Sequence, residues 1–220
     1  MKLKTLLLAI NLLVVAVLPL CAADLTRLDT TPAGNKIRIE GDSTFHKWQM
    51  EGSLVGGSAE VGPGFPLKPG AAVKPGKVDA KVSVFIPVRS LKSIEPDGKP
   101  YKTEMDNIMY EKLLEADHRR ITFTLTELTL KETPKTTADV YQFEAKGELV
   151  VAGVTNLITM PVMATVLGEN KIKFAGSLAA KMTDFKVTPP TKLGVFRTHD
   201  DIKLFFEWVA AKKTVPAAAK

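Results

Sequence analysis

Asp42, Ser43 and His46 are the residue types of a hydrolase triad, and they lie within five positions of one another. In such a site a histidine takes the proton of the serine hydroxyl, and an acid orients the histidine. The three side chains must converge in space, however, and residues this close together on one extended segment do not reach that geometry. The sequence therefore predicts that the protein is not an enzyme.

The three histidines, His46, His118 and His199, do not predict a metal site. They lie far apart in the sequence, and none belongs to a pair with the spacing of metal ligands. His46 has two interpretations: a half-buried histidine bonded to the backbone, or a contact for the polar head group of a ligand. Gly56 and Gly57 are followed by neither a helix nor a lysine, so no phosphate-binding loop is predicted either. We expect no metal and no cofactor.

Alternating apolar residues predict the strands that would position these side chains. From Val78 to Val88 every second residue is Val, Ala or Ile, which indicates a strand with one buried face. Two N-terminal segments and five further alternating ones bring the number to about eight. These segments are 36–41, 45–61, 121–130, 143–151, 158–166, 172–178 and 202–208.

The connections carry their own signals. A phase shift in the alternation at Glu127 predicts a β-bulge. Residues 154–156 are predicted to separate the two arms of a hairpin, and residues 168–170 to form the next turn. Residues 62–76 hold four prolines and four glycines, which is typical of a loop.

One segment has helical periodicity. Over residues 101–116 the apolar side chains recur at spacings of three and four, which predicts an amphipathic helix. A second helical turn is predicted to begin at Ser90. Met105 and Met109 lie on the apolar face of the longer helix, where flexible thioethers either pack into the core or adapt to an apolar ligand.

Sequential antiparallel strands with short turns predict an all-β fold, an eight-stranded up-and-down barrel with one or two short helices near one end, because closure removes exposed strand edges. Such a barrel either fills with side chains or holds one slender ligand. Its predicted inner face mixes bulky residues such as Phe206 and Trp208 with small ones such as Gly147 and Gly176. The sequence leaves the packed and the hollow interpretation equally open.

The face opposite the apolar one is charged, which excludes an outer-membrane barrel, since that class turns apolar residues toward lipid. Its charged residues are Asp79, Lys81, Glu144, Lys146, Glu148, Lys171, Lys173, Lys203 and Glu207. The lysines are spread along strands rather than gathered in a stripe, so no nucleic-acid partner is expected. We expect a soluble protein.

The first 23 residues predict a secretory signal peptide. Lys2 and Lys4 precede an apolar run from Leu6 to Leu18, and small residues precede Asp24. The run is shorter than the ~20 residues that cross a bilayer, so no stable membrane span is expected. Removing it lowers the net charge from +6 to +4, because it holds two lysines and no acid.

The predicted export gives the chain its organisation. Cys21 is the only cysteine, and the bulky Leu20 before it departs from the lipoprotein pattern, so lipid anchoring is not expected. The mature chain then has no thiol. We predict a signal peptide at 1–23, one barrel domain at 24–211 and a disordered tail at 212–220, in a periplasmic or secreted protein.

Several motifs occur in an order that resembles the YceI family. They are STFHKW at 43–48, Gly52, IPVRSL at 86–91, Met105, Met109 and Tyr110 in the helix, residues 121–123, the GELVVAGVT hairpin and the late FKVTPP segment. The resemblance covers residues 37–208. It implies an exported bacterial lipocalin-like barrel that holds an isoprenoid chain, such as a polyprenyl or quinone-like lipid.

From alternation and this resemblance together, we predict that the barrel binds one long apolar lipid for storage or transport in the bacterial envelope. The predicted ligand-binding residues are His46, Trp48, Val82, Val84, Ile86, Met105, Met109, Phe123, Met160 and Phe174. His46 or Trp48 would touch the polar end, and the two methionines would close the tunnel. Two alternatives remain: a ligand-free structural or interaction module of the periplasm, and an accessory that delivers a quinone for electron transfer. A homodimer also remains open.

Overall fold

The computed structural model describes residues 25–95, 97–101, 103–134, 140–192 and 196–212. The predicted signal peptide and the predicted tail beyond residue 212 lie outside these ranges. The strands within them are β1 (Thr26–Thr30), β2 (Lys36–Ser43), β3 (Lys47–Gly52), β4 (Gly56–Val61), β5 (Gly76–Lys77), β6 (Ala80–Pro87), β7 (Lys92–Ile94), β8 (Arg120–Glu132), β9 (Val140–Val151), β10 (Val154–Gly168), β11 (Lys171–Lys181), β12 (Thr191–Lys192) and β13 (Phe196–Ala211). One α-helix, α1 (Thr103–Lys112), and two 3-10 turns, η1 (Val88–Ser90) and η2 (Met182–Phe185), join them.

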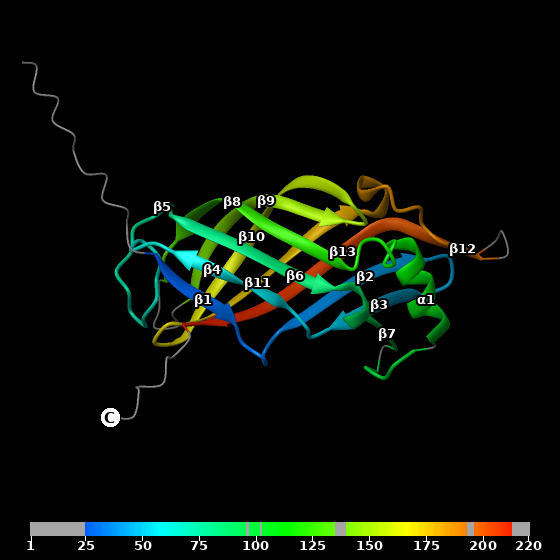
Figure 1. Ribbon diagram of the computed structural model, residues 1–220, viewed down its shortest axis with the longest axis horizontal. Helices are drawn as coiled ribbons and strands as arrows, with labels where there is room; N and C mark the ends of the chain where they lie inside the picture. The colour runs from blue at the N-terminus through cyan, green and yellow to red at the C-terminus, as the bar shows by residue number, and fades with distance from the viewer. Residues whose placement is uncertain (1–24, 96, 102, 135–139, 193–195, 213–220) are drawn as a thin grey trace, which may run out of the picture.

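Eight strands close an antiparallel barrel, as predicted (Figure 1). Around the ring they follow the order β1, β4, β6, β8, β9, β10, β11 and β13. The ring closes where Asp29 and Thr30 of β1 pair with Ala211 and Ala210 of β13. The other half of the long β13 pairs with β2, and the wall continues there through β3 and β7.

Several predicted boundaries are corrected. The predicted strand 45–61 is two strands, β3 and β4, and β1 was not predicted. Residues 154–156 belong to β10, because the hairpin turns earlier, at Ala152 and Gly153. Both have positive φ, 48° and 79°, the pairing that a tight two-residue turn between twisted strands requires.

The helix and the bulge were predicted more closely. The ladder between β8 and β9 shifts register between Leu125 and Glu127, which confirms the bulge. The helix is shorter than the predicted 101–116, since Leu114 adopts a positive φ of 51° that ends it. The second predicted turn is η1, which begins at Val88 rather than at Ser90.

The two ends of the barrel differ. At the end away from α1, which we call the base, the loop at residues 62–76 folds over the strands (Figure 1). The loop was predicted, but its packing was not: Phe65 is only 3% exposed, and Pro66 is also buried. The Tyr141 hydroxyl donates to the Ala71 carbonyl at 3.0 Å, and the backbone amide of Asn170 donates to the Leu67 carbonyl at 2.9 Å. These bonds hold the loop on the base.

Candidate functional site

The barrel encloses a cavity of about 260 Å³. One ordered water needs only ~10–15 Å³ by the same kind of measure, so this is far more than a packing void. The inner faces of β2, β3, β6, β8, β9, β10, β11 and β13 line the cavity, together with α1 and the segment around η2. The interior is therefore hollow, which decides between the two interpretations that the sequence left open.

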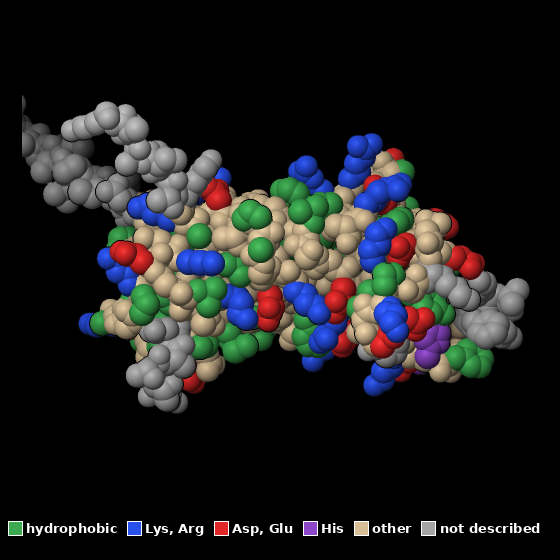
Figure 2. Space-filling model, turned by 90° about the horizontal axis from the view of Figure 1, so that it is seen from below, with side chains coloured by type: hydrophobic (Ala, Val, Ile, Leu, Met, Phe, Trp, Pro, Cys, Tyr) green, Lys and Arg blue, Asp and Glu red, His purple; other side chains and the backbone are tan. Residues whose placement is uncertain are grey.

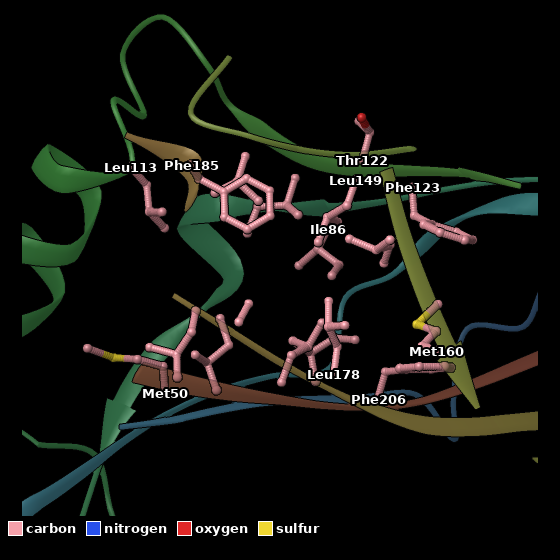
Figure 3. Close-up of a pocket in the computed structure, with 18 of the residues that line it drawn as sticks. Met50, Ile86, Leu113, Thr122, Phe123, Leu149, Met160, Leu178, Phe185 and Phe206 are labelled. Carbon is pink, nitrogen blue, oxygen red and sulfur yellow. The ribbon is translucent and has the colours of Figure 1, made fainter. Parts of the chain in front are cut away.

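The burial pattern of the inner face agrees with an accessible interior. Inward side chains such as Val82, Val84, Ile86, Phe123 and Phe206 are only half-buried. In a filled barrel such residues would be fully buried, because neighbours from the opposite wall would cover them. Figure 3 shows side chains from several strands surrounding an open centre.

Nine of the ten predicted site residues line the cavity: Trp48, Val82, Val84, Ile86, Met105, Met109, Phe123, Met160 and Phe174. The strand residues are inward because alternation places every second side chain on the inner face. Met105 and Met109 come from the helix instead. Whether these residues contact a ligand stays a prediction.

His46 is not part of the cavity lining. It is exposed in the turn between β2 and β3, where its backbone carbonyl accepts a hydrogen bond of 2.7 Å from the Ser43 hydroxyl. Asp42 accepts from the Ser43 backbone amide at 2.8 Å. These bonds shape a turn, and the three residues do not form the relay of a hydrolase triad.

Stacked aromatic rings lie at the base of the cavity. Phe174 and Trp208 line it and stack on each other with ring centroids 5.0 Å apart. Behind them, Phe65 from the base loop stacks on Phe143 at 5.4 Å. The Trp208 indole donates to the Thr30 hydroxyl at 2.8 Å, which satisfies its polar atom away from the cavity. This end is closed by packed apolar groups.

Helix α1 lies at the other end, which we call the mouth (Figure 1). Its apolar positions Met105, Ile108 and Met109 face the cavity, and Leu113 follows directly after it. Their spacing of three and four places them on one face of the helix. The helix therefore covers the mouth with flexible apolar side chains.

Polar contacts hold α1 against η1 and β7. Asp106 is 7% exposed, accepts the Ser93 amide at 2.7 Å and pairs with Lys92 at 3.3 Å. The Tyr110 hydroxyl donates to the Leu91 carbonyl at 3.0 Å and accepts from Lys92 at 2.7 Å. The hydrogen bond to Tyr110 is the largest cause of a raised Lys92 pKa.

The segment around η2 also lines the cavity, although the sequence did not predict this contribution. Met182, Phe185, Val187 and Pro190 all line the cavity near the mouth. Asn156 of β10 donates to the Asp184 carbonyl at 2.8 Å, and the Thr183 hydroxyl donates to Asp200 at 2.6 Å. No periodicity marks this segment, but its place in the FKVTPP motif was a usable signal.

The part of the chain that the structure describes gives the cavity an almost wholly uncharged lining. Among the described residues that line it, Lys112 at the end of α1 is the one with a charged side chain, and Thr122 and Thr198 are the ones with a hydroxyl group. Figure 3 shows the oxygen of Thr122 pointing away from the open centre. On the outside, by contrast, cationic and anionic side chains are interspersed (Figure 2). The arrangement suits an apolar ligand whose polar end lies at the mouth.

Other kinds of site find little support in the described ranges. No group of three or more His, Cys, Asp or Glu side chains there could hold a metal ion. Among those same residues, no helix has the length and apolar character needed to cross a bilayer.

The chain is similar to one known family in sequence and to two solved structures in fold. A sequence model of the YceI-like domain matches residues 31–210. The solved structure of BcnA from Burkholderia cenocepacia is 16% identical, with a TM-score of 0.58 over 83% of this chain and 100% of its own. A polyisoprenoid-binding domain from Saccharophagus degradans, implicated in plant cell wall breakdown, is 12% identical. Its TM-score is 0.58, over 87% of this chain and 99% of its own. No curated protein sequence matches the chain significantly.

Proposed function

The chain belongs to the YceI-like domain family, and from this premise we propose that its barrel binds one long apolar lipid, an isoprenoid or quinone-like molecule. The observation that carries the proposal is the cavity, which runs from α1 to the aromatic base and is lined almost wholly by apolar side chains. The structurally similar domain from Saccharophagus degradans is itself described as polyisoprenoid-binding. The function requires no catalytic step.

Burial of the chain supplies the affinity. Each methylene moved from water into the barrel contributes about 0.8 kcal/mol, so a long chain gains more than a short one. The thioethers of Met105, Met109 and Met160 adapt to the irregular outline of a methyl-branched chain. The closed base limits how far the chain enters.

The polar end of the lipid is expected at the mouth. Lys112 and Thr198 lie there, and the lysine stem is able to pack on apolar surface while its ammonium group reaches water. Trp48 also lines the cavity and keeps its role as a contact for this end. His46, exposed in a turn outside the lining, has no such role in the proposal.

We place this function in the periplasm or outside the cell, as storage or transport of the lipid in the envelope. The N-terminal sequence features carry this part of the proposal. The rival view, a packed barrel that acts only through its surface, is disfavoured by a cavity of about 260 Å³.

Mass spectrometry of organic extracts tests the proposal. The protein is expressed with its own N-terminal segment and purified from the periplasm without detergent. A stoichiometric isoprenoid in the extract is the expected result and identifies the ligand. A stable protein that carries no lipid, and takes none up from polyprenol or quinone, would overturn the proposal.

A pair of variants places the ligand inside the barrel. Val84 points into the cavity, and its neighbour Ser83 is exposed on the outer face of the same strand. We expect Val84→Glu to lose the bound lipid, because a carboxylate in an apolar cavity is strongly unfavourable, while Ser83→Glu retains it. Equal lipid content in the two purified variants would contradict the placement.

A further inference from the structure

Two phenylalanine rings in the cavity lie flat on glycines of the neighbouring strand. Gly176 in β11 pairs directly with Phe206 in β13, and a Cβ at Gly176 would stand 2.8 Å from two ring atoms. A Cβ at Gly147 in β9 would stand 2.6 Å from two ring atoms of Phe123 in β8. Real Cβ atoms do not approach so closely, so each ring occupies the space that a side chain would take. We call Gly147 and Gly176 the ring-bearing glycines.

These two rings lie on opposite walls. In the order of the eight-stranded ring, β8 and β13 are separated by β9, β10 and β11 on one side and by β6, β4 and β1 on the other. Figure 3 shows Phe123 and Phe206 on opposite sides of the open space, with Met160 between them at one end. Met160 comes from β10, midway between the two walls.

This arrangement explains how a barrel of this size stays hollow although it contains large aromatic residues. Eight strands enclose an interior that side chains normally just fill. A ring that lies on a glycine adds its thickness to the wall, whereas a ring that stands upright would cross the lumen. The separation of the Phe123 and Phe206 rings therefore sets the width of the cavity between mouth and base.

We propose that Phe123 and Phe206, held flat by the ring-bearing glycines, form a width gauge that admits one linear chain and excludes fused-ring and two-chain lipids. This inference rests on the proposed function and refines it by naming the shape of the ligand. A single polyprenyl or acyl chain passes between the rings. A sterol presents a rigid plate, and a phospholipid brings a second chain alongside the first, so neither passes without moving a ring.

The test widens the gauge without touching the glycines, since a Cβ there would also meet backbone carbonyls of the adjacent strand. Delipidated wild type and the Phe123→Leu/Phe206→Leu double variant are titrated with solanesol, a single polyprenyl chain, and with cholesterol. Phe85→Leu is the matched control, because Phe85 lies over Gly56 on the outer face of the barrel under the Arg120 guanidinium. Circular dichroism confirms that all three proteins are folded.

We expect wild type and Phe85→Leu to bind solanesol and reject cholesterol, and the double variant to gain cholesterol binding by about tenfold or more. Wild type that binds both lipids equally, or a folded double variant without any gain for cholesterol, would overturn the inference. The outcomes for the two proposals are distinct. Solanesol binding by wild type without a gain in the variant leaves lipid binding intact and removes the gauge. A gain of cholesterol binding in the variant without solanesol binding by wild type would show that the two rings exclude sterols, but it would remove the proposed ligand and the claim that one linear chain is admitted.

Discussion

The indole of Trp48 lies over Gly41, its direct cross-strand partner near the mouth, and fills the space of a side chain there. Gly56 and Phe85 repeat this relation on the outer face. We predict that Gly41→Ala pushes the indole out of place and weakens lipid binding about tenfold, while Gly56→Ala leaves binding unchanged because its ring moves into solvent. Titration of both delipidated variants checks this. Equal losses would show that strand distortion, rather than the indole, is responsible.

Asp106 is the buried acid that ties α1 to β7. We predict that Asp106→Ala lowers the free energy of unfolding by about 1–3 kcal/mol, because the buried Ser93 amide loses its acceptor. We also expect bound lipid to leave faster, since the helix over the mouth is less firmly held. Denaturant unfolding and a lipid-release assay measure the two effects.

Asp106→Asn is the matched control for that variant. It keeps an oxygen acceptor for Ser93 but loses the ion pair with Lys92. We expect it to fall between wild type and Asp106→Ala. Wild-type stability and release rate in Asp106→Ala would show that this contact does not hold the helix.

At the level of residues, alternation accounts for what was predictable. Val82, Val84 and Ile86 were placed in the cavity because every second residue of a strand faces the same side. No such rule governs a turn, and the half-buried histidine that the sequence favoured at position 46 is an exposed side chain instead. Lys112 was missed because a lysine at a helix end is ordinarily a solvated side chain.

Among the elements, the bulge in β8 has an electrostatic role. Glu127, at the register shift, pairs with Lys146 of β9 at 2.9 Å and Lys77 of β5 at 2.6 Å. The hydrogen bond from Lys146, followed by that from Lys77, lowers the pKa of Glu127 from 4.5 to about 2. Because the folded-state pKa is the lower one, the stabilisation is complete above about pH 4.5 and is lost as the pH falls towards 2.

We therefore predict that Glu127→Gln makes stability less dependent on pH between these limits and lowers the melting temperature slightly at neutral pH. Thermal unfolding from neutral to acidic pH measures both. Glu148→Gln is the control, since Glu148 is exposed on the same face of β9 as Lys146. If the two variants have the same pH profile, the bulge carboxylate does not provide this stabilisation.

Two features at the level of elements, the β9–β10 turn and strand β1, were not predicted correctly from the sequence. The β9–β10 turn was misplaced because residues 149–154 form an uninterrupted apolar run in which no polar residue marks the turn, although Ala152 and Gly153 adopt the positive φ that ends the strand. β1 was missed because five residues with mixed polarity, Thr26–Thr30, give no clear period. Its place in the ring depends on long-range pairing with β4 and β13, which local pattern does not report.

For the whole molecule, the difference between the two ends gives the barrel a direction. The mouth is covered by a short helix held through polar contacts, whereas the base is closed by stacked rings and a loop bonded to the strands. Polar contacts near the surface exchange with water more readily than a packed aromatic cluster does. A lipid is therefore expected to enter and leave past α1.

Phe65 is the residue on which closure of the base depends. It is 3% exposed and packs against Phe143 and Phe174, with ring centroids 5.4 Å and 6.0 Å away. We predict that Phe65→Ala lowers the free energy of unfolding by about 3–5 kcal/mol and speeds lipid release, because the cavity gains a second opening behind Phe174. Lys68→Ala in the same loop removes only an exposed ion pair with Glu169 and should change neither quantity measurably. Unfolding curves and lipid-release rates of both variants test this. If Phe65→Ala is destabilised but releases lipid at the wild-type rate, the base remains closed without the ring, and only the stacked Phe174 and Trp208 seal the cavity there.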